Sequence, residues 1–200
     1  MANDPNALDA WFPPPPPNAR ALAVQWAQRL LASADFLVLD TETTGLGARD
    51  EIVQIAVVNK NGQTVLDSLV RPTIPIPYFV STIHGITNAH VQDAPSFADL
   101  YPQLLQVFDG RPVVVFNAPF DRRMIQQSLA KHALPALDAR AFECAMLAYS
   151  RYHGERRGRS YKRKSLKFAC EHEGIHNNRA HWALNDCLVT LALVYVMAGG

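Results

Sequence analysis

The architecture is clearest in residues 36–45, Phe36-Leu37-Val38-Leu39-Asp40-Thr41-Glu42-Thr43-Thr44-Gly45. An apolar run that ends in acids is typical of a buried strand whose carboxyl end carries polar groups. Residues two apart on a strand point to the same face, so the carboxylates of Asp40 and Glu42 can reach one metal ion. Acidic pairs usually lie on solvated surface, so this pair indicates a metal site only if other acids join it.

Two further β-rich runs follow, Ile52 to Val58 and Thr64 to Val70. Between them lies Asn59-Lys60-Asn61-Gly62, and an Asn-Gly pair favours the positive φ angles of a hairpin turn. The sequence therefore predicts three consecutive antiparallel strands.

Amphipathic spacing predicts the remaining elements. A first helix is expected from Asn18, as N-cap, to Leu31, with Leu22, Trp26 and Leu30 recurring on its packing face. The other expected elements are a helix at Ser96 to Phe108, a strand at Pro112 to Phe116, and helices at Phe120 to His132, Phe142 to Tyr149, Ser165 to Glu173 and Trp182 to Met197. The order β-β-β-α-β-α with helices afterwards predicts an α/β domain with a mixed central sheet flanked by helices.

Length and composition fit one folded domain. The chain has 200 residues, of which 48% are hydrophobic, and this is enough for a single core. Pro13 to Pro17 form an unbroken proline tract, which favours a polyproline II rod. We therefore expect a proline-rich tail over residues 1–18 and one domain over residues 19–200. The tract is expected to be a stiff spacer, with binding of an SH3-like partner as the alternative.

Charge and cysteine content narrow the class of protein. The formal net charge is +1, so any contact with nucleic acid must be local. Cys144, Cys170 and Cys187 are odd in number and lack a CxxC pair, which argues for small buried apolar residues in a reducing compartment rather than for a disulfide framework. No secretion signal is recognisable, and the longest apolar run, Cys187 to Ala198, is too short to cross a bilayer. A soluble, cytoplasmic protein without membrane contact is expected.

Two more acids and a histidine can join the first pair. Asp121 follows the fourth strand and reaches the end of the first strand if the two are parallel neighbours; otherwise it stabilises a helix N-terminus. Asp186 lies near the start of an apolar helix, where a buried carboxylate requires a cation or a donor. His181 lies five residues earlier, so it can join a site only from the start of that helix or from the preceding loop. The alternative is a surface or capping histidine.

Together these segments resemble the three motifs of the DEDDh, or DnaQ-like, branch of the DEDD exonuclease superfamily. The matching segments are Leu39 to Gly45, Asn117 to Asp121 and His181 to Asp186, and the resemblance covers roughly residues 35–197. It implies an RNase H-like fold and a 3′→5′ exonuclease that releases nucleoside 5′-monophosphates.

The resemblance also implies a role for each motif residue. Asp40, Glu42, Asp121 and Asp186 would bind two divalent cations, and His181 would be the general base. Oxygen ligands suit Mg²⁺ or Mn²⁺, and a neutral imidazole accepts a proton near pH 7. Two such ions stabilise both the attacking and the leaving oxygen of a phosphodiester.

Further positions match substrate contacts of the family. The backbone at Thr43 would hold the terminal 3′-OH, and Leu46 would wedge against the last base. Asn117 belongs to the second motif, and His84, within Ile83 to Thr87, corresponds to a segment beside the terminal nucleotide, with an ordinary loop histidine as the alternative. Phe116 stands where many relatives carry histidine, so substrate contacts are expected to differ there.

The implied substrate is a single-stranded 3′ end, with DNA preferred over RNA because the first motif and Ile83 to Thr87 are similar to proofreading exonucleases. The same similarity makes a polymerase or repair protein a candidate partner. A non-catalytic nucleic-acid-binding module with this fold is the alternative function.

One local segment is strongly basic and contains one acid, Glu155, beside Tyr152 and Tyr161. Its basic residues are Arg151, Arg156, Arg157, Arg159, Lys162, Arg163, Lys164 and Lys167. Such a cluster favours contact with phosphates, and its aromatic rings can stack on bases; the alternative is a solvated loop.

His172 to His176 spells HExxH, the zinc-peptidase pattern. That pattern requires one continuous helical turn, whereas Gly174 within it favours a helix that ends there. A zinc site is therefore not expected.

Overall fold

The computed structural model describes residues 17–137 and 142–200. The proline-rich tail expected over residues 1–18 thus lies almost entirely outside the described residues. In the described part of the chain, no helix has the length and apolar character needed to span a membrane.

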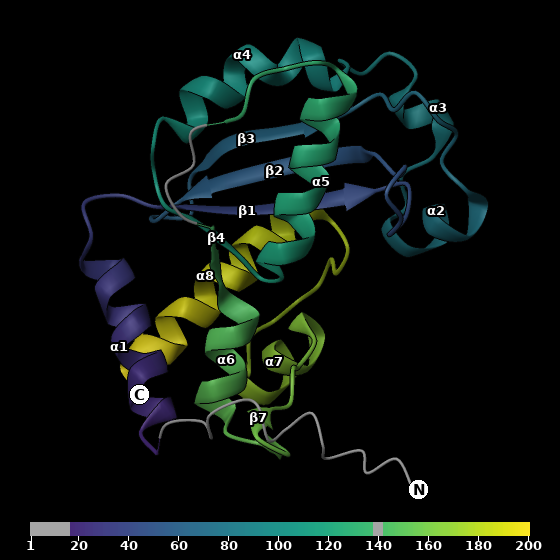
Figure 1. Cartoon of the computed structure of the whole chain (residues 1–200). Helices are drawn as coiled ribbons and strands as arrows, with labels where there is room; N and C mark the ends of the chain where they lie inside the picture. Colours follow the sequence, from purple (N-terminus) through teal and green to yellow (C-terminus); the bar gives the residue numbers. More distant parts are fainter. Residues whose placement is uncertain (1–16, 138–141) are drawn as a thin grey trace, which may run out of the picture.

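A five-stranded mixed sheet with the order β3-β2-β1-β4-β5 forms the centre of the molecule (Figure 1). Its strands are β1 (Leu37–Thr43), β2 (Ile52–Asn59), β3 (Thr64–Leu69), β4 (Val113–Val115) and β5 (Phe142–Cys144). β1, β2 and β3 pair antiparallel, whereas β4 is parallel to both β1 and β5. The predicted mixed sheet with three initial antiparallel strands is confirmed.

Helices flank this sheet. They are α1 (Ala19–Ala32), α2 (Tyr78–His84), α3 (Asn88–Val91), α4 (Phe97–Phe108), α5 (Ala118–Lys131), α6 (Ala145–His153), α7 (Leu166–Glu173) and α8 (Ala183–Gly199). A two-stranded hairpin of β6 (Arg156–Arg157) and β7 (Ser160–Tyr161) lies between α6 and α7.

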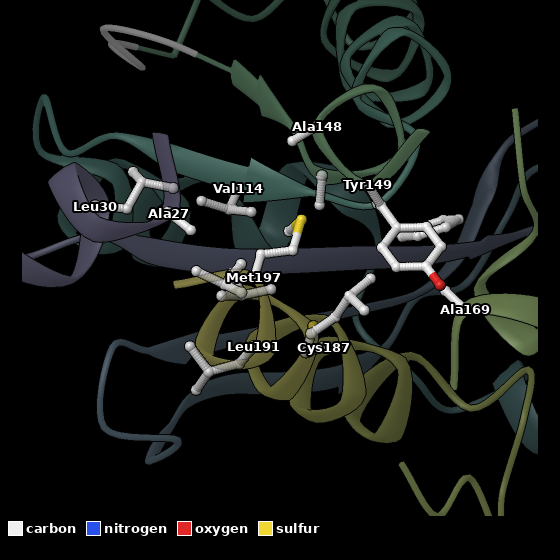
Figure 2. Close-up of a cluster of buried hydrophobic side chains, with 14 of the residues drawn as sticks. Ala27, Leu30, Val114, Ala148, Tyr149, Ala169, Cys187, Leu191 and Met197 are labelled. Carbon is white, nitrogen blue, oxygen red and sulfur yellow. The ribbon is translucent and has the colours of Figure 1, made fainter. Parts of the chain in front are cut away.

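The alternation of side chains along β1 separates two hydrophobic cores. Leu37 and Leu39 pack on one face of the sheet with apolar residues of α4 and α5. Val38 packs on the other face with α1, α6, α7 and α8, where Tyr149 and Met197 are fully buried (Figure 2). Because successive strand residues point to opposite faces, Asp40 and Glu42 continue the Val38 face, which α8 covers.

Local sequence explains where several elements begin and turn. Ser96 caps α4 by accepting a hydrogen bond from the Asp99 amide at 3.2 Å, and the Asp99 carboxylate accepts one from the Ser96 amide at 2.9 Å. Such a reciprocal box satisfies two amides that the first helical turn leaves without partners. Gly62 adopts φ +77° in the β2–β3 hairpin, as the Asn-Gly pair predicts.

Two sequence-based expectations are wrong in detail, and two short helices were missed. Of the predicted stripe, Leu30 is buried and Trp26 is partly buried against the core, but Leu22 is 40% exposed, because α1 turns Ala19, Ala23 and Ala27 to the core beside Leu30. Small alanines let the helix approach α6 and α8 closely, and this outweighs the preference for burying larger side chains. Residues 142–144 form a strand before α6 rather than the start of a helix. The short helices α2 and α3 were not predicted.

Candidate active site

Asp40 and Glu42 lie inside β1, which runs four residues beyond the apolar run that ends at Leu39. Leu39 of β1 pairs with Val115 of the parallel strand β4. Parallel neighbours end at the same edge of a sheet, so the segment after β4 arrives beside the two acids. That segment begins α5, which carries Asp121 in its first turn.

Asp121 is 3% exposed, and its carboxylate accepts hydrogen bonds from β1. Its Oδ1 accepts hydrogen bonds from the Thr41 amide at 3.1 Å and from the Thr41 hydroxyl at 2.8 Å. Thr41 points to the α5 face of the sheet, opposite to Asp40 and Glu42. The acids therefore converge on the end of β1 from both faces, and the motif analysis missed Thr41 because its side chain belongs to the other face.

Asp186 and His181 come from the start of α8 and the loop before it. Carboxylate oxygens of Glu42 and Asp186 and a ring nitrogen of His181 lie within 4.8 Å of one another. The His181 amide donates to Asp186 Oδ2 at 3.2 Å, which ties the loop to the acid. His181 is exposed and adopts φ +64°, a left-handed conformation that histidine tolerates better than most residues.

Gln54 of β2 positions the start of α8. Its Oε1 accepts a hydrogen bond from the Ala183 amide at 3.3 Å, and its Nε2 donates to Asp67 Oδ1 at 3.0 Å. Because Gln54 is 1% exposed, both of its polar groups depend on these protein partners. No sequence motif indicated Gln54. Its role depends on a hydrogen bond to α8, which is distant in the sequence, so the role can be recognised only in the folded structure.

Burial raises the pKa values of all four acids, and neighbouring carboxylates add to the increase at Asp40 and Glu42. Burial raises the pKa of Asp40 well above its usual range, with further increases from Asp121, Glu42 and Asp186. Burial also raises the pKa of Glu42 to about 8 and that of Asp121 to about 7, the latter against the hydrogen bonds from Thr41. The pKa of Asp186 is raised by burial as well. Four neighbouring acids with raised pKa values, two of them raised further by adjacent carboxylates, indicate a place where a cation belongs.

The donor set fits divalent metal ions. Among the described residues, no hydrogen bond ends on the carboxylates of Asp40 or Glu42. A buried carboxylate without a donor or cation is costly, whereas oxygen-rich clusters of this kind are the ligands that hard divalent cations prefer. The four acids could therefore hold such ions.

These side chains line a cleft of about 340 Å³. Its lining residues are Asp40, Thr41, Glu42, Leu46, Phe116, Asn117, Phe120, Asp121, Leu166, His181 and Asp186. Asn117 is exposed there, directly before α5. Phe116, Phe120 and Leu166 add apolar groups to this lining, so the cleft combines acids with surfaces suited to a base or sugar.

The loop that carries Leu46 is held in place although Leu46 itself is 78% exposed. Asp50 accepts hydrogen bonds from the Thr44 hydroxyl at 2.9 Å and the Gly47 amide at 2.6 Å. Arg123 of α5 donates to the Leu46 carbonyl at 3.0 Å. An exposed apolar side chain on a fixed loop at the mouth of a cleft is suited to press on a flat group.

His84 is buried, and its ring is used within the protein. Nδ1 accepts a hydrogen bond from the Ile86 amide at 3.0 Å, so the proton lies on Nε2, which faces the Thr43 carbonyl at 3.3 Å. Burial lowers the pKa of His84. Neither ring nitrogen is available to hydrogen-bond a nucleotide, and the ring instead fixes the backbone at Thr43.

The two remaining sequence features lie outside the cleft. α7 ends at Glu173, and Gly174 caps it with φ +70°, so the HExxH residues do not share one helical turn. Of the cysteines, Cys170 and Cys187 are buried as expected, but Cys144 is only partly buried at the edge strand β5. The basic residues surround the β6–β7 hairpin.

Comparison with known proteins agrees with this geometry. The model of the RNase T exonuclease family matches residues 37–194. An uncharacterized exonuclease of Escherichia phage 186 is 38% identical over 174 residues, which are 83% of this chain and 89% of the phage protein. A DNA polymerase III subunit epsilon-like protein of Rhodobacter capsulatus is 42% identical over 108 residues, 50% of this chain but 15% of that protein. The chain thus spans only a small part of the polymerase-related proteins that it matches.

Solved structures share the fold. Exonuclease X in complex with 5′ overhanging duplex DNA has a TM-score of 0.60 and 27% identity, covering 82% of this chain and 92% of that chain. The nuclease domain of 3′hExo, a DEDDh family member bound to rAMP, has a TM-score of 0.70 and 17% identity, covering 84% of this chain and 94% of that one. Nucleases of the DEDDh family use divalent metals. From the order of its motifs, its sheet and its family match, this chain belongs to the RNase T/DEDDh family of exonucleases.

Proposed function

We propose that this chain is a 3′→5′ exonuclease that acts on single-stranded 3′ ends of DNA and releases nucleoside 5′-monophosphates. The observation that carries the proposal is the convergence of four acids and one histidine from β1, α5 and α8 on a single cleft. We further propose that residues 19–200 constitute the exonuclease domain.

Each residue has a distinct role in this proposal. Asp40, Glu42, Asp121 and Asp186 hold two divalent cations, Mg²⁺ or Mn²⁺. When bound, two such ions stabilise charge on both the attacking and the leaving oxygen of the phosphodiester. His181 takes the proton from the attacking water, for which its exposed loop position gives it access.

Residues other than the four acids and His181 position the 3′ end of the substrate. The backbone at Thr43, fixed by His84, receives the terminal 3′-OH. Leu46 presses on the last base, and Asn117 contacts the strand beside the acids. His84 thus acts through Thr43 rather than by direct contact with the nucleotide.

DNA is the proposed substrate because more of the matching proteins and structures are named for DNA than for RNA. The matching proteins include DNA polymerase III components, and the matching structures include Exonuclease X with duplex DNA and E. coli Exonuclease I with a dT13 oligonucleotide. The rAMP complex of 3′hExo is the counterexample. A polymerase or repair protein is the corresponding candidate partner.

The test is digestion of 5′-labelled single-stranded DNA and of RNA with the same sequence, by one preparation with Mg²⁺ or Mn²⁺. We expect a ladder that shortens from the 3′ end, release of 5′-mononucleotides, and faster digestion of DNA. Asp40→Asn should abolish release while leaving the fold intact. Binding without turnover by the wild type would instead support a non-catalytic nucleic-acid-binding module.

A further inference from the structure

Five arginines at the end of α6, on the β6–β7 hairpin and just after it form a second surface, here called the arginine surface. Its members are Arg151, Arg156, Arg157, Arg159 and Arg163, and all five are exposed. In the described part of the chain, none of them forms an ion pair, whereas the neighbouring lysines do. Lys162 and Lys164 bind Glu155, and Lys167 lies 3.9 Å from Glu171. The charge left for a partner therefore belongs to guanidinium groups, which bind phosphate through two parallel hydrogen bonds.

The hairpin holds these arginines in a defined arrangement. The single acid of the segment, Glu155, accepts the Lys162 ammonium at 2.9 Å, while its backbone carbonyl accepts the Lys162 amide at 2.9 Å. The guanidinium of Arg156 lies over the ring of Tyr161, 5.1 Å from its centre. A solvated loop, the alternative reading of this segment, would need none of these contacts.

Between the arginines the surface is hollowed. One concavity of about 300 Å³ is lined by Leu147 and Ser150 of α6 together with Arg151, Arg159, Ser160, Tyr161 and Arg163. A second concavity, of about 340 Å³, is also lined by Ser160, Tyr161 and Arg163. Its remaining lining residues are Arg157 and Lys162. Guanidinium groups around such hollows suit a nucleic-acid strand, with its phosphates on the arginines.

The arginine surface is connected to the active-site cleft by short stretches of chain on two sides. Arg163 is three residues before Leu166, which lines the cleft, so their Cα atoms lie within about 11 Å of each other. On the other side, the Met146 amide donates to the carbonyl of the cleft residue Phe116 at 2.8 Å, and Leu147 follows in the first concavity. Figure 1 shows the hairpin beyond the far end of α6.

The length of α6 indicates how far the strand must extend from the cleft to meet the arginine surface. This helix has nine residues and therefore spans about 13 Å at 1.5 Å per residue. A stacked strand advances about 3.4 Å per nucleotide, so about four nucleotides cover that distance.

We propose that the arginine surface binds the phosphodiester backbone of the strand about two to five nucleotides upstream of the 3′ end, and thereby favours strands long enough to reach it. This proposal rests on the proposed function, because it names where the rest of the same strand lies once its 3′ end occupies the cleft. It predicts that catalysis itself does not need the arginines, but that capture of longer strands does.

The test compares the wild type with the combined variant Arg157→Gln, Arg159→Gln, Arg163→Gln. Oligodeoxythymidylates of two to ten nucleotides are the substrates, and p-nitrophenyl thymidine 5′-monophosphate is a short substrate that cannot reach the hairpin. For the wild type, KM should fall with length up to about five nucleotides. For the variant this gain should be lost, on the order of tenfold in kcat/KM, while hydrolysis of the short ester stays unchanged. Arg71→Gln, beside β3 at the opposite edge of the sheet, is the matched control and should behave as the wild type.

Salt dependence gives a second readout that does not need turnover. Binding of a phosphorothioate 12-mer, followed by fluorescence anisotropy, should show a salt slope about 2 smaller in the combined variant, at roughly 0.7 for each lost contact. An unchanged slope and an unchanged length profile in the folded variant would overturn the proposal. Failure of the wild type to hydrolyse either substrate would instead reject the proposed function, and the binding measurement would still decide the role of the arginines.

Discussion

At the scale of single residues, burial and close grouping make ionisation of the active-site acids unfavourable, and this suits the acids to hold cations. Asp40, Glu42 and Asp121 each have a raised pKa through burial, and Asp40 and Glu42 also through neighbouring carboxylates. Without cations, the cluster keeps protons that exposed acids would release. Hydrogen bonds from Thr41 are the main favourable protein contact that Asp121 receives.

Thr41 is therefore expected to be a positioning residue. Thr41→Val keeps the shape of the side chain but removes the hydroxyl that donates to Asp121 at 2.8 Å. We expect metal affinity or kcat to fall by about 10–100-fold, as for other residues that orient a metal ligand. Thr41→Ser should restore most of the loss, because it retains the donor. Equal activity of the valine and serine variants in Mn²⁺ titrations would show that the hydroxyl has no such role.

At the scale of elements, the active site depends on how β1, α5 and α8 are anchored to one another. Gln54 is the clearest anchor, since it connects β2 to the first turn of α8 and is almost fully buried. The same start of α8 carries Asp186, so a loosened helix start displaces a proposed metal ligand.

We expect Gln54→Leu to lower the free energy of unfolding by about 1–3 kcal/mol, because the buried Ala183 amide loses its acceptor. Urea unfolding measures this change. The control is Gln63→Leu, at an exposed hairpin position, for which a change within about 0.5 kcal/mol is expected. If both variants unfold at the same urea concentration, Gln54 does not anchor the helix.

The elements also show how far the sequence predicts this molecule. The Asp-x-Glu strand, the Asn-Gly hairpin and the Ser96 cap are local signals, and each predicted its element correctly. Leu22 and residues 142–144 were assigned wrongly because their burial and pairing depend on partners far away in the chain. Thr41 and Gln54 could not be found from motifs, since each matters only through a contact with another element. His84 was predicted as a substrate contact, whereas its ring nitrogens face the Thr43 carbonyl and the Ile86 amide.

At the scale of the whole molecule, stability should depend on pH and on metal together. The folded-state pKa of Glu42 is raised from 4.5 to about 8, and that of Asp121 from 3.8 to about 7. The folded protein therefore binds more protons than the unfolded chain between about pH 4 and pH 8, so its stability falls as the pH rises through this window. The contribution is fully present below about pH 4 and lost above about pH 8.

Divalent metal should reverse this loss, since ions bind the deprotonated carboxylates. At an ion concentration one hundred times Kd, the gain is about 2.7 kcal/mol, or roughly 5–10 °C in Tm for a chain of this size. Thermal unfolding with EDTA and with Mn²⁺ at pH 5.5 and pH 8 checks this, and the increase should be larger at pH 8. The same increase in Asp40→Asn would mean that the ions bind elsewhere.

The most direct test of the central claim is the number of Mn²⁺ ions bound per chain, measured by equilibrium dialysis at pH 8 with a mononucleotide present. Four acids converging on one cleft predict two ions for the wild type and at most one for Asp186→Asn, with release of mononucleotides lost in the variant. A wild-type chain that binds no Mn²⁺, or an Asp186→Asn chain that still binds two ions and digests DNA at the wild-type rate, would contradict the claim.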